Sequence, residues 1–275
     1  MPDAAPNEPD GLDPYRLAAG APADLQRAAD ALRAANHECE RLIHQLELWK
    51  ALATDREMLA RLGPSEVAQA VLTARDALLT AIVLGIGRMV DESRPGALNV
   101  FPSFNAVLRH ASWLRDDRKG HFAALPVMLC GDRQRSDAEA ADLERMIQQG
   151  SAQRAVAGFD AQLEAFRAAK KRFTSGDAGA ALKRLRELRH KEMAHNDLEA
   201  VWATERPKVR DLDLALHALR DLLYSATLLC TGCHVDALHD RQRAKRAALC
   251  FGAVLRRETA EERAAASEGA EGGPG

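Results

Sequence analysis

One segment of the sequence carries an arginine and a histidine at a spacing that suits phosphate chemistry. Arg189 and His195 lie six residues apart in a stretch with a helical apolar pattern. On a helix they are offset by roughly 120° around the axis, a gap that the long arginine side chain can close. Histidine titrates near neutral pH and can take a proton from a ribose hydroxyl. Arginine stays charged and can clamp phosphate oxygens, so this pair is sufficient for RNA cleavage without a metal ion.

Asn196 directly follows this histidine and can support it. Its amide could orient the imidazole or cap the end of the helix. The alternative is that His195 and Asn196 only terminate a helix before Asp197. A single Arg/His pair is common in proteins, so the spacing favours a phosphate site without establishing one.

Basic residues accumulate around the same segment. Between Arg167 and His195 there are nine Lys or Arg against three acidic residues, an excess of +6 in a chain whose formal net charge is −2. Such a local positive field attracts phosphate groups. We predict that Lys183, Arg186 and Lys191 contact RNA. On charge alone, a solvated helix face whose basic residues offset the helix dipole near its C-terminus is the better explanation.

The composition favours helices. The chain has 275 residues, of which 47% are hydrophobic but only 4% are aromatic, so the core must consist mostly of small aliphatic side chains. A net charge of −2 excludes a histone-like nucleic-acid protein. Five cysteines, an odd number, argue against a disulfide framework and fit a reducing compartment. The N-terminus does not read as a signal peptide, and no long apolar run predicts a membrane span, so we expect a cytoplasmic protein.

The apolar periodicity predicts an all-α protein, a bundle of four to five main helices with disordered termini. We expect one helical domain over 21–257, with a disordered tail at 1–20 and a disordered acidic tail at 258–275. Gly120 to Gly131 resembles a loop, and Gly232 is a candidate kink. The predicted helices cover 22–62, 65–91 (the buried central one), a short stretch at 101–114, 136–173, 178–195 and 211–256.

Two other patterns suggest metals but are less favoured. Cys230-Thr231-Gly232-Cys233-His234 matches the attachment pattern of c-type haem, which requires export, and also a partial zinc site that could include His239. Small cysteines buried on a core helix explain the same residues. Glu192 and His195 form half of a di-iron motif, and no matching half lies on another predicted helix. We therefore expect no metal and no cofactor.

Two longer segments resemble a known superfamily. The run Leu188-Arg189-His190-Lys191-Glu192-Met193-Ala194-His195-Asn196-Asp197 is similar to the signature of HEPN domains. Upstream, the apolar helix that ends in Arg88-Met89-Val90-Asp91 resembles the AbiU-type branch, in which such a helix ends in Arg-x-x-Asp. The order of predicted helices fits as well, and the resemblance covers about residues 22–230.

The resemblance implies an all-α domain that usually forms a homodimer. Many such domains are metal-independent endoribonucleases of toxin–antitoxin or abortive-infection systems, so RNA and an antitoxin protein are expected partners. Arg189 would then clamp the phosphate, His195 would be the general acid or base, and His190 would be the polar motif residue. Arg88 and Asp91 would form a structural ion pair. The alternative is a non-catalytic HEPN-like module that binds RNA, a nucleotide or a partner protein.

Overall fold

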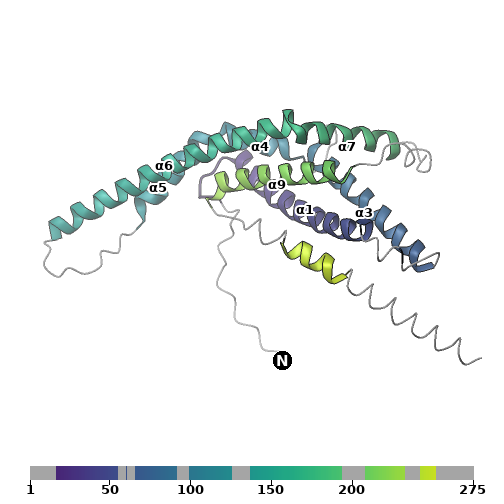
Figure 1. Cartoon of the computed structure of the whole chain (residues 1–275). Helices are drawn as coiled ribbons and strands as arrows, with labels where there is room; N and C mark the ends of the chain where they lie inside the picture. The colour runs from purple at the N-terminus through teal and green to yellow at the C-terminus, as the bar shows by residue number, and fades with distance from the viewer. Residues whose placement is uncertain are drawn as a thin grey trace, which may run out of the picture. The chain divides into compact units, whose positions relative to one another are not determined.

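A computed structural model (Figure 1) describes a set of separate segments of the chain. These segments are 17–54, 60, 66–91, 99–125, 137–193, 208–232 and 242–251, without the side chains of 54, 137 and 190–193. Within them the regular structure is helical and no strand occurs, which confirms the predicted all-α class.

The helices follow the apolar periodicity of the sequence. The labelled ones are α1 (Ala23–Thr54), α3 (Glu66–Val90), α4 (Val100–Arg109), α5 (Ala111–Ala124), α6 (Asp137–Ser175), α7 (Asp177–Met193) and α9 (Val209–Thr231), and 242–251 is also helical. Gly232 follows α9 with a φ of 71°, a left-handed conformation that ends helices and confirms the predicted break.

The segment after residue 100 differs from the prediction. The short helix expected at 101–114 is two helices, α4 and α5, which meet at His110. Helix α5 continues through Gly120, where a loop was predicted. A side chain added at Gly120 would meet no atom within 4 Å, so this glycine is exposed and costs the helix only about 1 kcal/mol relative to alanine. That cost is too small to stop a helix that packs on its other face.

The chain divides into two compact units. The first comprises residues up to Ala35, Leu98–Arg172 and Asp221–Val235, and the second comprises Asn36–Ala97, Phe173–Arg220 and Asp236 onward. Helices α1, α6 and α9 are each divided, with one part in the first unit and the other part in the second. A single domain over 21–257 remains a prediction. The predicted tail at 258–275, and the one at 1–20 as far as residue 16, lie outside the described residues.

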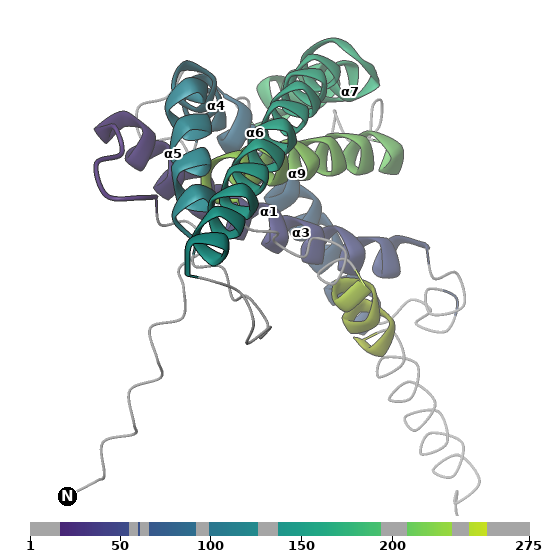
Figure 2. The ribbon, with the colours of Figure 1, turned by 90° about the vertical axis from the view of Figure 1, so that its left-hand side faces the viewer.

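In the first unit, α5 runs beside α6 (Figures 1 and 2), and polar contacts link the two helices. Arg115 donates to Asp160 at 2.9 Å, and Arg118 donates to Gln162 at 2.8 Å. Arg118 also donates to the carbonyl oxygens of Leu228 and Leu229 at 2.9 and 3.0 Å. The Leu228 carbonyl also accepts from the backbone N–H of Gly232 at 2.9 Å, and the guanidinium adds a side-chain donor to these two carbonyls at the end of α9.

An ionic contact joins the beginning of α1 to the junction of α4 and α5. His110 Nε2 lies 2.8 Å from Asp24 Oδ1, and Arg109 Nη1 donates to Asp24 Oδ2 at 2.9 Å. We call Asp24, Arg109 and His110 the amino-terminal clamp. Hydrogen bonding from His110 lowers the pKa of Asp24, although partial burial opposes this shift.

In the second unit, α3 packs against both α7 and the second half of α1. One face of α3 is buried through Leu79, Ile82, Val83, Ile86 and Met89. Two glycines near its end, in the sequence Gly85-Ile86-Gly87, face different neighbours. A Cβ at Gly85 would lie 2.5 Å from Leu42 Cδ2 of α1. These helices therefore approach more closely than side chains on α3 would allow.

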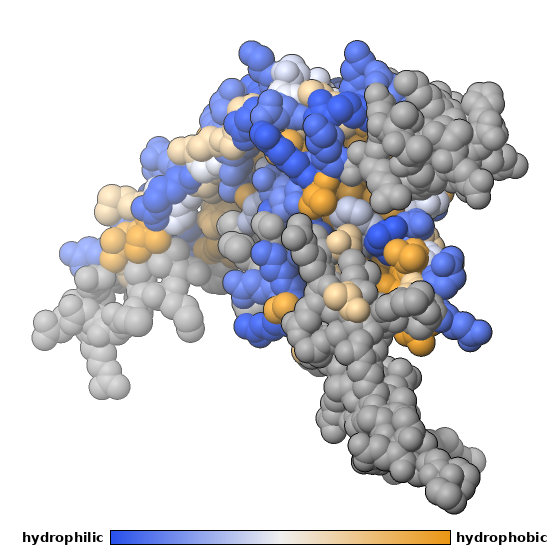
Figure 3. All heavy atoms as spheres, turned by 45° about the vertical axis from the view of Figure 1, so that its right-hand side comes forward, coloured by the Kyte–Doolittle hydropathy of each residue, from blue (hydrophilic) through white to orange (hydrophobic). Residues whose placement is uncertain are grey.

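Helix α3 is also the one described helix that is long and apolar enough to cross a membrane by length and composition. Its most apolar stretch of 18 residues has a mean hydropathy of 1.6, and 33% of that stretch is buried. The core helix of a soluble protein can have the same length and composition. Leu84 on this helix is 38% exposed. Elsewhere, hydrophilic residues predominate on the face drawn in Figure 3, and hydrophobic residues form separate small patches.

Candidate functional site

The two segments singled out in the sequence meet in the second unit. Arg189 on α7 donates through Nη2 to Asp91 Oδ2 at 2.8 Å, although the two residues are 98 positions apart. Both side chains are largely buried, with 13% of Arg189 and 12% of Asp91 exposed. An ion pair withdrawn from water in this way is costly to break, because each charge would be left without its partner.

Gly87 on α3 provides the space in which Arg189 lies. A Cβ at this position would be 2.7 Å from Arg189 Nη1 and 3.1 Å from its Cδ, so the side chain lies flat against the helix backbone. The recess beside it is lined by apolar side chains of α3 and α7 and has a free volume of about 10 Å³, on the order of one water molecule. No nucleotide fits there. The apolar lining consists of Val83, Ile86, Val90, Leu182 and Leu185.

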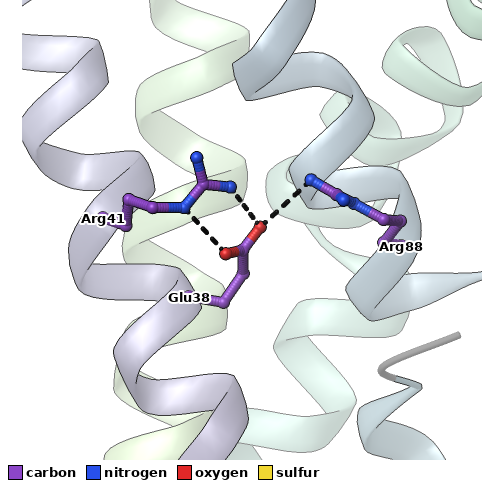
Figure 4. A network of polar contacts seen from close by, with 3 residues as sticks. All are labelled: Glu38, Arg41 and Arg88. Carbon is purple, nitrogen blue, oxygen red and sulfur yellow. Dashed lines mark hydrogen bonds and ion pairs between the residues drawn. The ribbon is translucent and has the colours of Figure 1, made fainter.

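The expected pairing of Arg88 with Asp91 is wrong for the described part of the chain. Arg88 Nη2 instead lies 3.4 Å from Glu38 Oε1 on α1 (Figure 4), whereas Asp91 accepts from Arg189. On α3, Arg88 is directed toward α1 and Asp91 toward α7. Each side chain pairs across helices, because neighbouring helices offer partners of opposite charge. The Arg-x-x-Asp segment therefore connects three helices.

The basic residues that were predicted to contact RNA differ in how far they are engaged by other groups of the protein. Arg186 donates to the backbone carbonyl of Val90 at 3.2 Å, which helps to cap the end of α3. Lys183 is 79% exposed, and its Nζ lies 3.9 Å from Glu187. Arg184, which was not among the predicted contacts, is 55% exposed and donates two hydrogen bonds to Asp211. Part of the basic run thus joins the protein's own helices, and part of it is accessible.

The remaining predicted residues lie outside the description. His195 and Asn196 fall in the stretch 194–207, and of His190 and Lys191 only the backbone, at the end of α7, is described. The proposed proton-transfer group therefore has no described position. Arg189 and Asp91 carry the geometry of the site.

The cysteine pattern is described only at Cys230, because Cys233, His234 and His239 lie outside the described segments. Cys230 is buried at the end of α9, and burial raises the pKa of its thiol to about 12. Among the described residues, no group of three His, Cys, Asp or Glu side chains is placed to hold a metal ion.

A comparison with known families gives a match for this chain. The family model described as AbiU2, from the HEPN group, matches residues 25–249. The chain belongs to the AbiU2 family. It is therefore an abortive-infection-related HEPN-like domain. No curated protein and no solved structure matches this AbiU2 chain. The resemblance seen in the two sequence segments is confirmed at the level of the family.

Sequence analysis missed several residues of the AbiU2 site. Gly87, Glu38 and Arg41 were not singled out, although Gly87 lies against Arg189, Glu38 meets Arg88, and Arg41 pairs with Glu38. The sequence contained one usable signal, the Gly-x-Gly spacing in an apolar helix, which indicates close approach by neighbours. Nothing in the sequence indicated that Glu38 would be the carboxylate that meets Arg88.

Proposed function

We propose that this chain is an RNA-binding module of abortive-infection defence in which Arg189 is structural. The observation that carries the proposal is the buried ion pair of Arg189 with Asp91. A phosphate clamp has to be accessible, and this guanidinium is 13% exposed beside a recess of water size. The geometry therefore favours a structural role for Arg189, which holds α7 against α3.

The accessible cations of α7 support RNA as the ligand. Lys183 and Arg184 are exposed and lie in the stretch with the +6 excess. Lys183 pairs with Glu187 on the surface, and such a pair contributes only about 0–1 kcal/mol and exchanges readily for phosphate oxygens. Arg184 is held more firmly, because its partner Asp211 is buried, but 55% of its side chain is open to a phosphate. Phosphate contacts of this kind supply affinity without base specificity. Cytoplasmic action, a homodimer and an antitoxin partner belong to the same proposal through the family resemblance.

A metal-independent endoribonuclease is the second candidate function, and the completeness of the motif favours it. In that reaction, His195 takes the proton of a ribose 2′-hydroxyl, and the 2′-oxygen attacks the adjacent phosphorus. The bond to the 5′-oxygen breaks, and this oxygen takes up a proton from water or from the protonated imidazole, which leaves a 2′,3′-cyclic phosphate and a 5′-hydroxyl. Arg189 would stabilise the charge on the phosphorane oxygens. For this role its guanidinium has to exchange Asp91 for the phosphate.

The two candidates separate in one experiment on the full chain. Fluorescent single-stranded RNA is incubated with the purified protein in the presence of a chelator. Binding is followed by anisotropy, and RNA length is followed on a denaturing gel. The variants are His195→Ala and Lys183→Ala/Arg184→Ala, with Arg145→Ala/Arg154→Ala on α6 as a control of equal charge.

Binding without cleavage, weakened by the α7 double variant and not by the control, supports the RNA-binding module. If the parent cleaves RNA and His195→Ala does not, the result supports the nuclease and refutes a purely structural role for the motif. If the parent neither binds nor cuts RNA, both candidate functions fail.

A further inference from the structure

Two exposed arginines converge on a single carboxylate between α1 and α3. Arg41 donates to Glu38 through Nε at 2.9 Å and through Nη2 at 2.6 Å, so that both carboxylate oxygens accept a hydrogen bond. Arg88 Nη2 reaches the same Oε1 atom from α3 at 3.4 Å (Figure 4). The two Nη2 atoms can therefore be no further apart than the sum of these last two distances.

This cluster carries one positive charge more than its carboxylate neutralises. Glu38 is 19% exposed, whereas 47% of Arg41 and 59% of Arg88 is open to solvent. Arg41 satisfies the carboxylate in a two-point contact, which leaves Arg88 with a long contact only. A guanidinium has five donors, so most of the hydrogen-bonding capacity of Arg88 is not used by Glu38.

The backbone beneath the cluster is held closely. A Cβ at Gly85 would lie 2.5 Å from Leu42 Cδ2 and 3.2 Å from Glu38 Oε1, so α1 and α3 meet at the level of the cluster. Because α3 and the part of α1 from Asn36 onward belong to the second unit, packing sets the spacing of the two backbones that carry the arginines. Binding an anion at such a place costs less ordering entropy than on mobile side chains.

We propose that Arg41 and Arg88 form a phosphate-binding site in which an RNA backbone phosphate takes the place of the Glu38 carboxylate. Phosphate offers more acceptor oxygens than a carboxylate and suits paired guanidinium groups. Glu38 then acts as an internal competitor that holds the arginines in position while the site is empty. The identity of the ligand as RNA rests on the proposed function.

The site also adjoins the motif segments. Arg88 directly follows Gly87, against which the side chain of Arg189 lies. A strand held at Arg41 and Arg88 is therefore bound beside the end of α3 that carries Asp91. The buried arginine of the motif and the exposed arginines of the cluster thus divide two tasks, support of the helices and contact with phosphate.

The test measures the affinity of the full chain for a labelled single-stranded RNA over a range of salt concentrations. We expect Arg41→Ala/Arg88→Ala to weaken binding roughly tenfold or more and to lower the salt slope by about one, because one phosphate contact is lost. The control Arg145→Ala/Arg154→Ala removes the same charge from α6 and should change affinity less than about threefold. Glu38→Gln should tighten binding several-fold, because it removes the competing charge.

Equal losses in the two double variants, or weaker binding by Glu38→Gln, would overturn the site. Thermal melts of each variant show whether folding is retained. A second arm uses pyrophosphate alone and follows the melting temperature. If pyrophosphate raises the melting temperature of the parent but not that of Arg41→Ala/Arg88→Ala, while the parent binds no RNA, the result supports the phosphate site and refutes RNA as its ligand. Absence of both effects refutes the site.

Discussion

Separating Arg189 from Asp91 is expected to destabilise the protein rather than to release a functional arginine. Removal of one partner from a fully buried ion pair costs about 3–5 kcal/mol, and loss of an exposed pair costs about 0–1 kcal/mol. With 12–13% of each side chain exposed, the pair lies near the buried limit. We therefore expect Asp91→Ala to lower the free energy of unfolding by about 2–3 kcal/mol.

Arg189→Ala should cost at least as much, because it also removes the contact of the aliphatic stem with Gly87 and the apolar recess. The double variant should lose less than the sum of the two single losses, by about 1–2 kcal/mol. The assay is urea unfolding followed by circular dichroism, with RNA anisotropy on the same samples. Asp142→Ala/Arg145→Ala serves as the control, since these residues form an ion pair on α6 that is 66% and 77% exposed.

Two results would refute the reasoning. Additive single losses would mean that the two side chains do not interact in solution. An Asp91→Ala variant of unchanged stability and tighter RNA binding would mean that Arg189 is a phosphate clamp that Asp91 restrains. The second result would restore the nuclease as the preferred function.

Three further predictions concern the helices around the site. Gly85→Ala should destabilise by about 1–3 kcal/mol in urea unfolding through overpacking, whereas Gly120→Ala, in open space, should stabilise slightly; equal effects would contradict close packing at α3. Because the pKa of Asp24 is lowered in the folded state, the amino-terminal clamp stabilises the protein at neutral pH and loses this effect as the pH falls below about 4. In melting temperatures measured against pH, Asp24→Asn should therefore show a smaller decrease at acid pH than the parent. Maleimide labelling read by mass spectrometry should modify the exposed Cys250 and spare Cys230, whose thiol stays protonated; equal labelling of the two would show that α9 opens.

Much of the helical framework could be predicted from the sequence, because apolar periodicity is a local property. The helices α3 and α6 were predicted to within a few residues, and the break at Gly232 was predicted as well. The division of 101–124 into two helices was missed. Exposed glycines such as Gly120 weaken a helix too little to end it, so their effect depends on what the opposite face packs against.

The sequence also determined the family, since both motif segments are continuous runs of residues that can be recognised without coordinates. The partners of the charged side chains were decided only by the tertiary structure. Arg88 and Asp91 are three residues apart on one helix, yet one pairs with α1 and the other with α7. The physical reason is that a long side chain on a packed helix reaches charges on neighbouring helices as easily as those on its own. Which of these charges is nearest depends on how closely the glycines allow the backbones to approach.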